Sequence, residues 1–312
     1  MSQPTLDELF ERRITYPDFD LKERLDRLVG LDHYKLRLTK MLGLLVNPKH
    51  LQDWMVRHHP QADRLISLVS CRPPLVILAG DVGSGKTELA ETIGDAVARQ
   101  EHIDLTLFPL SLSTRGQGRV GEMTQLISAA FDHTVAEATK LKGHGGKTRG
   151  GIILLIDEAD ALAQSREAAQ MHHEDRAGVN ALIRGVNRLA NAHLPAAVIM
   201  CTNRLGALDP AVKRRAADIM EFTRPDDEQR RAVLRGALHD AAFSIHDLDA
   251  LVAATGSTAK HSYGFTFSDL TQRLLPAIVL DAYPDSAISA KRAVEIAKRM
   301  NATPPFKEAG NE

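Results

Sequence analysis

The sequence carries almost no net charge. Its 39 lysines and arginines against 40 aspartates and glutamates leave a formal charge of −1 over 312 residues. A chain this balanced has no field strong enough to steer it as a whole onto nucleic acid or an anionic membrane. We therefore expect no nucleic-acid partner. Because 44% of the residues are hydrophobic, the chain has enough apolar surface to bury a core, which argues against disorder.

Cysteine and long hydrophobic runs are also scarce. The two cysteines, Cys71 and Cys201, are too few and too far apart in sequence for a disulfide framework or a zinc site, which favours reduced, cytosolic thiols. No apolar stretch approaches the roughly 20 residues of a membrane-spanning helix. The first twenty residues contain no hydrophobic segment of signal-peptide length. We expect a cytoplasmic protein without a membrane partner.

Short apolar runs alternate with segments of helical spacing through the first two thirds of the chain. The apolar runs lie at 75–79, 105–110, 152–156, 197–201 and, more weakly, 218–222. The helical segments between them lie at about 86–99, 120–141 and 177–191, after a helical region at 21–70. Short apolar runs bounded by breakers are typical of buried parallel strands. The alternation predicts an α/β fold, a parallel sheet with helices on both faces.

After Arg224 and Pro225 the strand-like runs stop, and the remaining segments have helical composition. We predict an N-terminal extension at 1–24, an α/β domain at 25–224, a small all-helical lid domain at 225–303 and a flexible tail at 304–312. Two main domains agree with a length about twice that of a usual single domain.

Two smaller expectations concern single side chains. Trp54 is flanked by Leu51 and Met55, and we expect it in the core. Helical spacing also predicts that Arg230, Arg231 and Arg235 form one solvent-exposed helix face.

A glycine-rich segment follows the first apolar run. Residues 80–87 read GDVGSGKT and match the pattern G-x-x-x-x-G-K-[ST] at every fixed position. Glycines let backbone N–H groups turn inward around a phosphate, and the following helix presents its positive N-terminus. Lys86 would reach the β- and γ-phosphates of ATP, and the Thr87 hydroxyl would bind Mg²⁺. The predicted nucleotide-binding residues are Asp81, Val82, Gly83, Ser84, Gly85, Lys86, Thr87 and Glu88.

Two acids end the apolar run at 152–156. In open α/β sheets, ligands bind at the carboxyl ends of the strands, which is where Asp157 and Glu158 stand. Asp157 would hold Mg²⁺ directly or through water, and Glu158 would orient and polarise the attacking water. The alternative is that these acids cap the next helix, with Asp157 or Asp160 as the N-cap.

Asn203 and a pair of arginines complete the candidate catalytic set. Asn203 follows the run at 197–201 and could hydrogen-bond the attacking water or the γ-phosphate, although a turn asparagine is the alternative. The segment that starts at Leu208 begins a helix with Asp-Pro and ends in cations, which could simply favour the helix C-terminus. Alternatively Arg215, or Arg214 in its place, is an arginine finger for the γ-phosphate of a neighbouring subunit.

These motifs, in this order and followed by a helical lid, resemble the AAA+ ATPases from about Leu25 to Met300. The resemblance implies Mg²⁺-dependent ATP hydrolysis in a homohexamer, with ATP bound between subunits. It assigns Val29 and Gly30 to the adenine pocket. In the lid, Ser268 stands where many relatives have a nucleotide-sensing arginine, and Arg273 could substitute from the next helical turn.

Less generic stretches resemble the pachytene-checkpoint ATPases, a group that remodels HORMA-domain proteins. These stretches are 109–113, 175–189 and 215–219. For bacterial members the resemblance implies disassembly of a HORMA-domain protein complex with a nucleotidyltransferase in anti-phage signalling. The pore loop of this group carries an aromatic pair, whereas the corresponding residues here are Arg115, Gly116, Gln117, Gly118 and Arg119. Because glycine and glutamine grip a substrate less well, we expect limited pulling rather than processive threading.

Other functions share parts of this pattern. A DEAD-box helicase needs a second RecA-like domain, and a GTP-binding protein needs an N-K-x-D or T-K-x-D segment; we find neither. A nucleotide kinase also combines a P-loop with a helical lid, but it does not need an Asp-Glu pair that activates water. Another AAA+ unfoldase, chaperone or loader stays open, as does a nucleotide-switched scaffold with little turnover.

Overall fold

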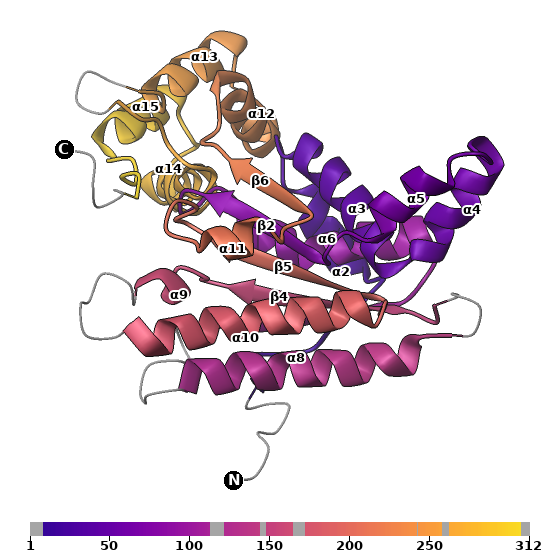
Figure 1. Cartoon of the computed structure of the whole chain (residues 1–312). Coiled ribbons are helices and arrows are strands. Elements are labelled where there is room, and N and C mark those ends of the chain that lie inside the picture. The colour runs from indigo at the N-terminus through magenta and orange to yellow at the C-terminus, as the bar shows by residue number, and fades with distance from the viewer. Residues whose placement is uncertain are drawn as a thin grey trace. The chain divides into compact units, whose positions relative to one another are not determined.

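A six-stranded sheet in the order β1-β3-β4-β5-β2-β6 organises the first two thirds of the chain (Figure 1). Its strands are β1 (Ile14–Tyr16), β2 (Leu75–Gly80), β3 (Leu105–Ser111), β4 (Gly151–Asp157), β5 (Ala196–Thr202) and β6 (Asp218–Phe222). All five predicted strands are present. Strands β3, β4, β5 and β2 pair in parallel, and nearly all their residues are buried, which explains their uninterrupted apolar character.

This computed structural model describes residues 9–112, 122–143, 148–164, 172–241, 243–257 and 262–306. The chain divides into two compact units. Unit 1 comprises Met1–Asp26, Tyr34–Ala79 and Thr87–Glu221. Unit 2 comprises Arg27–His33, Gly80–Lys86 and Phe222–Glu312. The glycine-rich loop therefore packs with the C-terminal helical part of the chain.

The predicted parallel sheet has one additional strand, which runs antiparallel at its edge. Strand β1 pairs antiparallel with β3, with Ile14 opposite Leu107. It is three residues long and half-buried in alternation, so it leaves too short a pattern to be recognised in the sequence. The sheet is therefore mixed, as is common for α/β proteins with an antiparallel edge strand.

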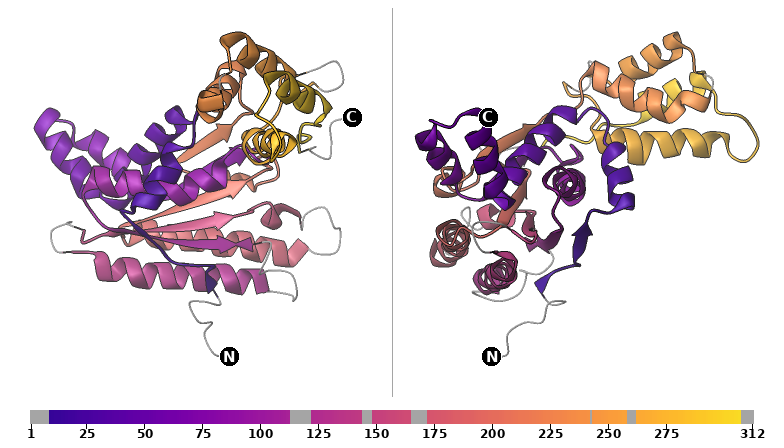
Figure 2. Two further views of the ribbon diagram at one scale, coloured as in Figure 1. Left: turned by 180° about the vertical axis from the view of Figure 1, so that it is seen from behind. Right: turned by 90° about the vertical axis from the view of Figure 1, so that its right-hand side faces the viewer.

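Helices cover both faces of the sheet in unit 1 (Figure 2). The helices are α2 (Phe19–Asp26), α3 (Asp32–Val46), α4 (Pro48–His58), α5 (Asp63–Ser70), α6 (Lys86–Glu101), α8 (Glu122–Leu141), α9 (Ala161–Gln164), α10 (His172–Asn191) and α11 (Pro210–Lys213). Helices α8 and α10 lie side by side on one face, and α3 and α6 lie on the other. Phe131 of α8 and Leu182 of α10 join Leu154 of β4 in one buried core.

Unit 2 contains the C-terminal helices, as the prediction of a helical C-terminal part required. They are α12 (Asp227–Leu238), η2 (His239–Ala241), α13 (Ile245–Ala254), the π-helix η3 (Asp269–Leu274), α14 (Leu275–Ala282) and α15 (Ala290–Arg299). Capping boxes begin α12 at Asp226 and α13 at Ser244. Leu234, Leu251 and Leu270 lie in the core of these helices. The domain boundary at 224/225 stays a prediction.

Two predictions about single side chains were wrong. Trp54 is 46% exposed and lies beside the rings of His58 and His59 rather than in the core. Arg230 is buried, and its guanidinium donates hydrogen bonds to the Pro225 carbonyl at 2.7 Å and the Asp227 carboxylate at 2.5 Å.

None of the helices in the described ranges is both long and apolar enough to cross a bilayer.

Candidate active site

The glycine-rich loop has a backbone that only glycine adopts without strain. Gly80, Gly83 and Gly85 have φ angles of 149°, 75° and 91°. A Cβ atom at Gly80 would lie 2.2 Å from the carbonyl oxygen of Phe222, so a side chain is also excluded by space. Helix α6 begins at Lys86, directly after the loop. This is the loop-and-helix arrangement that binds phosphate groups.

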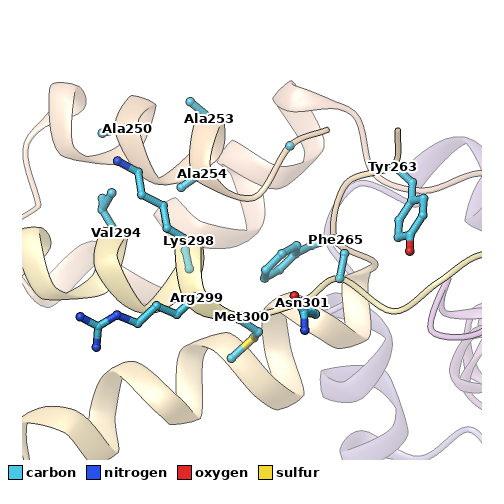
Figure 3. Close-up of a pocket in the computed structure, with 13 residues that line it drawn as sticks. Ala250, Ala253, Ala254, Tyr263, Phe265, Val294, Lys298, Arg299, Met300 and Asn301 are labelled. Carbon is cyan, nitrogen blue, oxygen red and sulfur yellow. The ribbon is translucent and has the colours of Figure 1, made fainter. Parts of the chain in front are cut away.

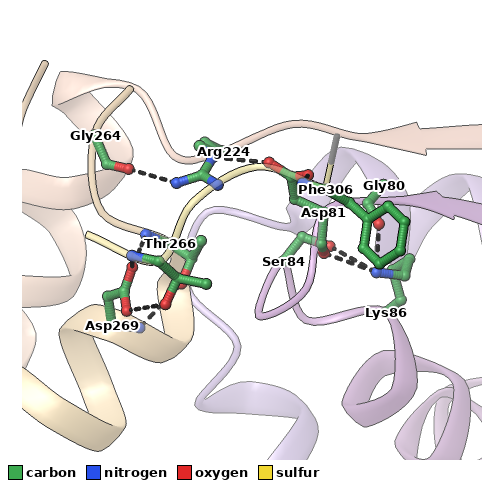
Figure 4. Close-up of polar contacts among 10 residues, drawn as sticks. Gly80, Asp81, Ser84, Lys86, Arg224, Gly264, Thr266, Asp269 and Phe306 are labelled. Carbon is green, nitrogen blue, oxygen red and sulfur yellow. Dashed lines mark hydrogen bonds and ion pairs between the residues drawn. The ribbon is translucent and has the colours of Figure 1, made fainter. Parts of the chain in front are cut away.

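Lys86 is held inside this loop (Figure 4). Its ammonium group donates to the carbonyl oxygens of Gly80 and Asp81, both at 2.8 Å, and to the Ser84 hydroxyl at 3.3 Å. Lys86 is only 6% exposed, and a buried cation needs such acceptors to offset the loss of water. The loop therefore keeps the cation where the sequence pattern places nucleotide phosphates. Val82, at the loop's outer side, is 51% exposed.

The segment predicted to form the adenine pocket lies in the same unit. Gly30 has a φ angle of 82°, and its carbonyl accepts a hydrogen bond from the Gln229 side chain at 2.7 Å. A Cβ atom there would lie 3.5 Å from the Phe267 ring. Val29 is 37% exposed. The contact of Val29 and Gly30 with adenine stays a prediction.

Ser268, rather than Arg273, lies against the glycine-rich loop. The Ser268 backbone N–H donates to the Gly83 carbonyl at 3.1 Å. Arg273 instead pairs with Asp269 at 2.6 Å and donates to the Asn301 carbonyl at 3.2 Å. Its Nη1 makes both contacts, and the cofactor role of Arg273 stays a prediction.

Asp269 is the buried carboxylate around which this part of unit 2 is arranged. It is 1% exposed and accepts hydrogen bonds from the backbone N–H groups of Thr266 and Thr303, both at 3.0 Å. Burial alone would raise the pKa of Asp269, but these hydrogen bonds, with the Thr303 hydroxyl and Arg273, outweigh it and hold the pKa below its usual value. The carboxylate is therefore charged and fixes the segment that contacts the loop.

In unit 1, the two predicted acids stand at the carboxyl end of β4. Asp157 is the last residue of the strand and lies opposite Ser111 of β3. Glu158 follows with a φ angle of 54°, an uncommon backbone conformation for a residue with a side chain. Its carboxylate accepts a hydrogen bond from the Ser111 hydroxyl at 2.9 Å. Such backbone strain is found preferentially at functional sites.

Asp160 links these acids to the end of β5. It is 8% exposed and accepts hydrogen bonds from the Thr202 hydroxyl, from the Asn203 N–H at 2.9 Å and from the Arg204 N–H at 3.2 Å. Its hydrogen bonds thus go to β5 and the turn after it, not to the next helix as the capping alternative supposed. The sequence indicated Asn203 but not this carboxylate as the group that places it.

Arg214 and Arg215 fold back onto helix α11. The Asp209 side chain caps this helix by accepting from the Ala211 N–H at 2.7 Å. Arg214 donates to the Pro210 carbonyl at 3.2 Å, and Arg215 donates to the Ala211 carbonyl at 3.1 Å. These single bonds to carbonyls of their own helix are weak enough to exchange for a phosphate. The assignment of a finger to either arginine stays a prediction.

The predicted metal ligands offer the chemistry that Mg²⁺ prefers. Thr87 is exposed in the first turn of α6, and Asp157 ends β4, so both present hard oxygen atoms. Glu88 is occupied elsewhere, because both of its carboxylate oxygens accept from Arg24 at 2.8 Å. Among the described residues, no group of three His, Cys, Asp or Glu side chains could hold a metal alone. Mg²⁺ takes few protein ligands and completes its shell with phosphates and water, so the oxygen atoms of Thr87 and Asp157 are ligands of the kind it uses.

Two further regions bear on the search for a site. The predicted pore loop, Arg115 to Arg119, lies outside the described residues. A hollow of about 830 Å³ in unit 2 is lined by residues of α13 such as Ala253, by residues of α15 such as Lys298, and by Phe265 (Figure 3). No carboxylate occurs among its described lining residues.

Comparison with known proteins identifies the family. The model of the ATPase family associated with various cellular activities (AAA) matches residues 76–224. The chain is 64% identical over 304 residues to CD-NTase-associated protein 6 of Escherichia coli (strain MS 115-1), covering 97% of this chain and 98% of that protein. The chain belongs to the AAA family of ATPases. This confirms the predicted ATPase with its α/β fold and helical C-terminal part.

Solved structures agree at the level of the whole chain. The structure of the E. coli MS115-1 HORMA:CdnC:Trip13 complex contains a chain with a TM-score of 0.90 and 62% identity, covering 98% of this AAA chain and all of that one. Rhizobiales Trip13 matches with a TM-score of 0.75 and 56% identity, covering 95% of this chain and all of that one. The predicted resemblance to the HORMA-remodelling group of AAA ATPases is confirmed.

The position of Asp160 leads to a kinetic prediction. In Asp160→Ala, the backbone of Asn203 loses its acceptor, so kcat for ATP hydrolysis should fall on the order of tenfold or more through misplacement of the catalytic groups. The KM for ATP should change little, because the glycine-rich loop is untouched. Asp160→Asn, which keeps one acceptor oxygen, should lose less.

The matched control is Asp132→Ala, which removes an exposed acid of α8 that pairs only with Arg188 among the described residues. Steady-state kinetics and circular dichroism on all three variants decide the matter. A folded Asp160→Ala enzyme with the kcat of wild type would contradict the role assigned to Asp160.

Proposed function

We propose that this ATPase remodels a HORMA-domain protein, alone or in complex with a nucleotidyltransferase, and so regulates bacterial anti-phage signalling. One observation carries the proposal: a chain 62% identical to this one over nearly its whole length stands in a solved HORMA:CdnC:Trip13 complex. The relative that is 64% identical is named for its association with a CD-NTase. Identity this high over full length supports the same type of partner.

The chemistry we propose is attack of water on the γ-phosphorus of ATP. The bond from this phosphorus to the β–γ bridging oxygen breaks, and ADP leaves. Glu158 accepts the proton of the attacking water, and Asn203 holds either that water or the γ-phosphate by a hydrogen bond. Lys86 compensates charge on the phosphates from within the loop where its ammonium is held.

We propose that Thr87 and Asp157 hold Mg²⁺ together with the nucleotide. When bound, the ion neutralises charge on the β- and γ-phosphates. The exposed position of Thr87 and the placement of Asp157 at a strand end support this assignment.

We further propose that the active form is a cytoplasmic homohexamer with shared sites. Arg215, or Arg214 in its place, would leave its carbonyl partner on α11 and bind the γ-phosphate in the neighbouring subunit. Hydrolysis would move the predicted pore loop, 115–119, against the HORMA-domain protein. The absence of aromatic residues from this loop favours limited pulling on one segment of the partner.

The function is tested with a purified complex of a HORMA-domain protein and a nucleotidyltransferase, such as the HORMA protein and CdnC found with the E. coli MS115-1 relative. Wild type with ATP should separate their complex, as measured by size-exclusion chromatography. Glu158→Gln should still bind ATP and the HORMA-domain protein, but it should neither hydrolyse ATP nor separate the complex, because the amide cannot accept a proton from water. Hydrolysis at the wild-type rate by Glu158→Gln would remove that residue from its role, and an intact complex with active wild type would contradict the proposed function.

The shared site is tested by mixing inactive subunits. Lys86→Ala lacks the phosphate contact, and Arg215→Ala lacks the finger, so each alone should be inactive. Mixed rings contain interfaces that join an intact loop to an intact finger, and activity should partly return. Because a finger of this kind contributes about 10³–10⁵ in rate, even a few such interfaces are measurable. If neither Arg215→Ala nor Arg214→Ala mixtures recover activity, the site is not shared.

A further inference from the structure

The glycine-rich loop contains an acidic side chain whose negative charge opposes the binding of phosphate groups. Residues 80–86 carry two charged side chains, Asp81 and Lys86, whose charges cancel. The Asp81 carbonyl accepts from the Lys86 ammonium at 2.8 Å, so the acid belongs to the same turn as the phosphate-binding cation. An uncompensated carboxylate at this place would repel a triphosphate.

Arg224 compensates this carboxylate (Figure 4). Its Nε donates to the Asp81 carboxylate at 2.8 Å, and its Nη1 donates to the Gly264 carbonyl at 2.8 Å. The guanidinium lies 4.8 Å from the centre of the Tyr263 ring, which favours a cation. With 14% of the Arg224 side chain and 24% of the Asp81 side chain exposed, the pair is screened less by water than an ordinary surface ion pair.

Arg224 acts on Asp81 as a charge as well as a hydrogen-bond donor. Its Nη2 is buried and has no hydrogen-bond partner in the described part of the chain. Charge compensation depends on the whole guanidinium and not on each of its donors, so it does not require Nη2 to be paired.

We propose that Arg224 is a positioning residue for nucleotide binding that cancels the charge of Asp81. With Arg224 in place, the loop and its partner carry a net charge of +1, and the cation of Lys86 is left to act on the phosphates. This inference rests on the proposed binding of ATP phosphates at residues 80–87. It assigns a role in nucleotide affinity to a residue 143 positions from the loop.

Charge compensation and simple structural support predict different effects of these substitutions on nucleotide affinity. If Arg224 cancels charge, Arg224→Gln exposes the phosphates to the Asp81 carboxylate and weakens binding, whereas Asp81→Asn removes the repulsion and does not weaken it. The double variant should then bind like wild type. If the pair is only a structural latch, both single variants lose the same contact, and the double variant stays weak.

The experiment measures binding of the non-hydrolysable ATP analogue with an NH group in place of the β–γ bridging oxygen. Isothermal titration calorimetry on the full chain with Mg²⁺ should show Kd about tenfold higher for Arg224→Gln at low salt, and a smaller difference at high salt. Asp81→Asn should bind more tightly than wild type, because it removes a negative charge and keeps the backbone N–H groups of the loop, and the double variant should lie within about twofold of wild type. Arg224→Lys, which keeps the charge, should bind nearly as wild type.

Two controls separate the inference from its alternatives. Arg231→Gln removes an exposed lid arginine that pairs with Asp249 at 2.5 Å, and it should leave binding unchanged. Adenosine carries no phosphate, so its affinity should be equal in wild type and Arg224→Gln. A loss of adenosine binding in Arg224→Gln would show that the site itself is damaged and would overturn the electrostatic role.

The other possible results distinguish failure of this inference from failure of the proposed phosphate site. Equal loss in Arg224→Gln and Asp81→Asn, without recovery in the double variant, would contradict the inference and leave the proposed function standing. Wild-type binding by Arg224→Gln would contradict it as well. Wild-type binding by Lys86→Ala would instead show that the phosphates do not lie at the loop, and the proposed site would fail with it.

Discussion

The hydrogen bonds of the buried Asp160 carboxylate hold together the edge of the sheet where the proposed catalytic residues lie. It is the third residue after β4 and accepts hydrogen bonds from Thr202 through Arg204 at the end of β5. A carboxylate that is 8% exposed is tolerated only when such donors satisfy it. One short turn therefore carries the proposed metal ligand, the proposed base and the group that fixes Asn203, so these three positions are set together.

In unit 2, a buried carboxylate likewise fixes the backbone beside the glycine-rich loop. Asp269 is buried and accepts from Thr266 and Thr303, and the adjacent Ser268 contacts the loop at Gly83. In each unit, a buried carboxylate fixes a backbone segment that lies at or beside residues used in the proposed reaction. Rigid placement of this kind is what lets catalytic groups act without reorganising during the reaction.

The five predicted strands and the glycine-rich loop could be recognised in the sequence, because an apolar run or a glycine pattern occupies consecutive residues. Strand β1 was missed because three residues are too few to show the alternation of buried and exposed side chains that marks a strand. Thr202 lies 42 residues from Asp160 and Asp81 lies 143 residues from Arg224, and no local pattern reports such contacts. Arg230 was misplaced for a different reason, because its acceptors Pro225 and Asp227 are near in sequence: helical spacing indicated an exposed face, but it does not report which polar groups satisfy a buried guanidinium.

Asp160 holds the backbone of Asn203 in place by accepting a hydrogen bond from the Asn203 N–H group. Amide hydrogen exchange of the Asp160→Ala variant, compared with wild type and with Asp132→Ala, measures this directly. We predict faster exchange of the Asn203 and Arg204 amides, because each loses an acceptor, while the amides within β4 and β5 keep their protection. Unchanged protection at both amides would contradict the claim.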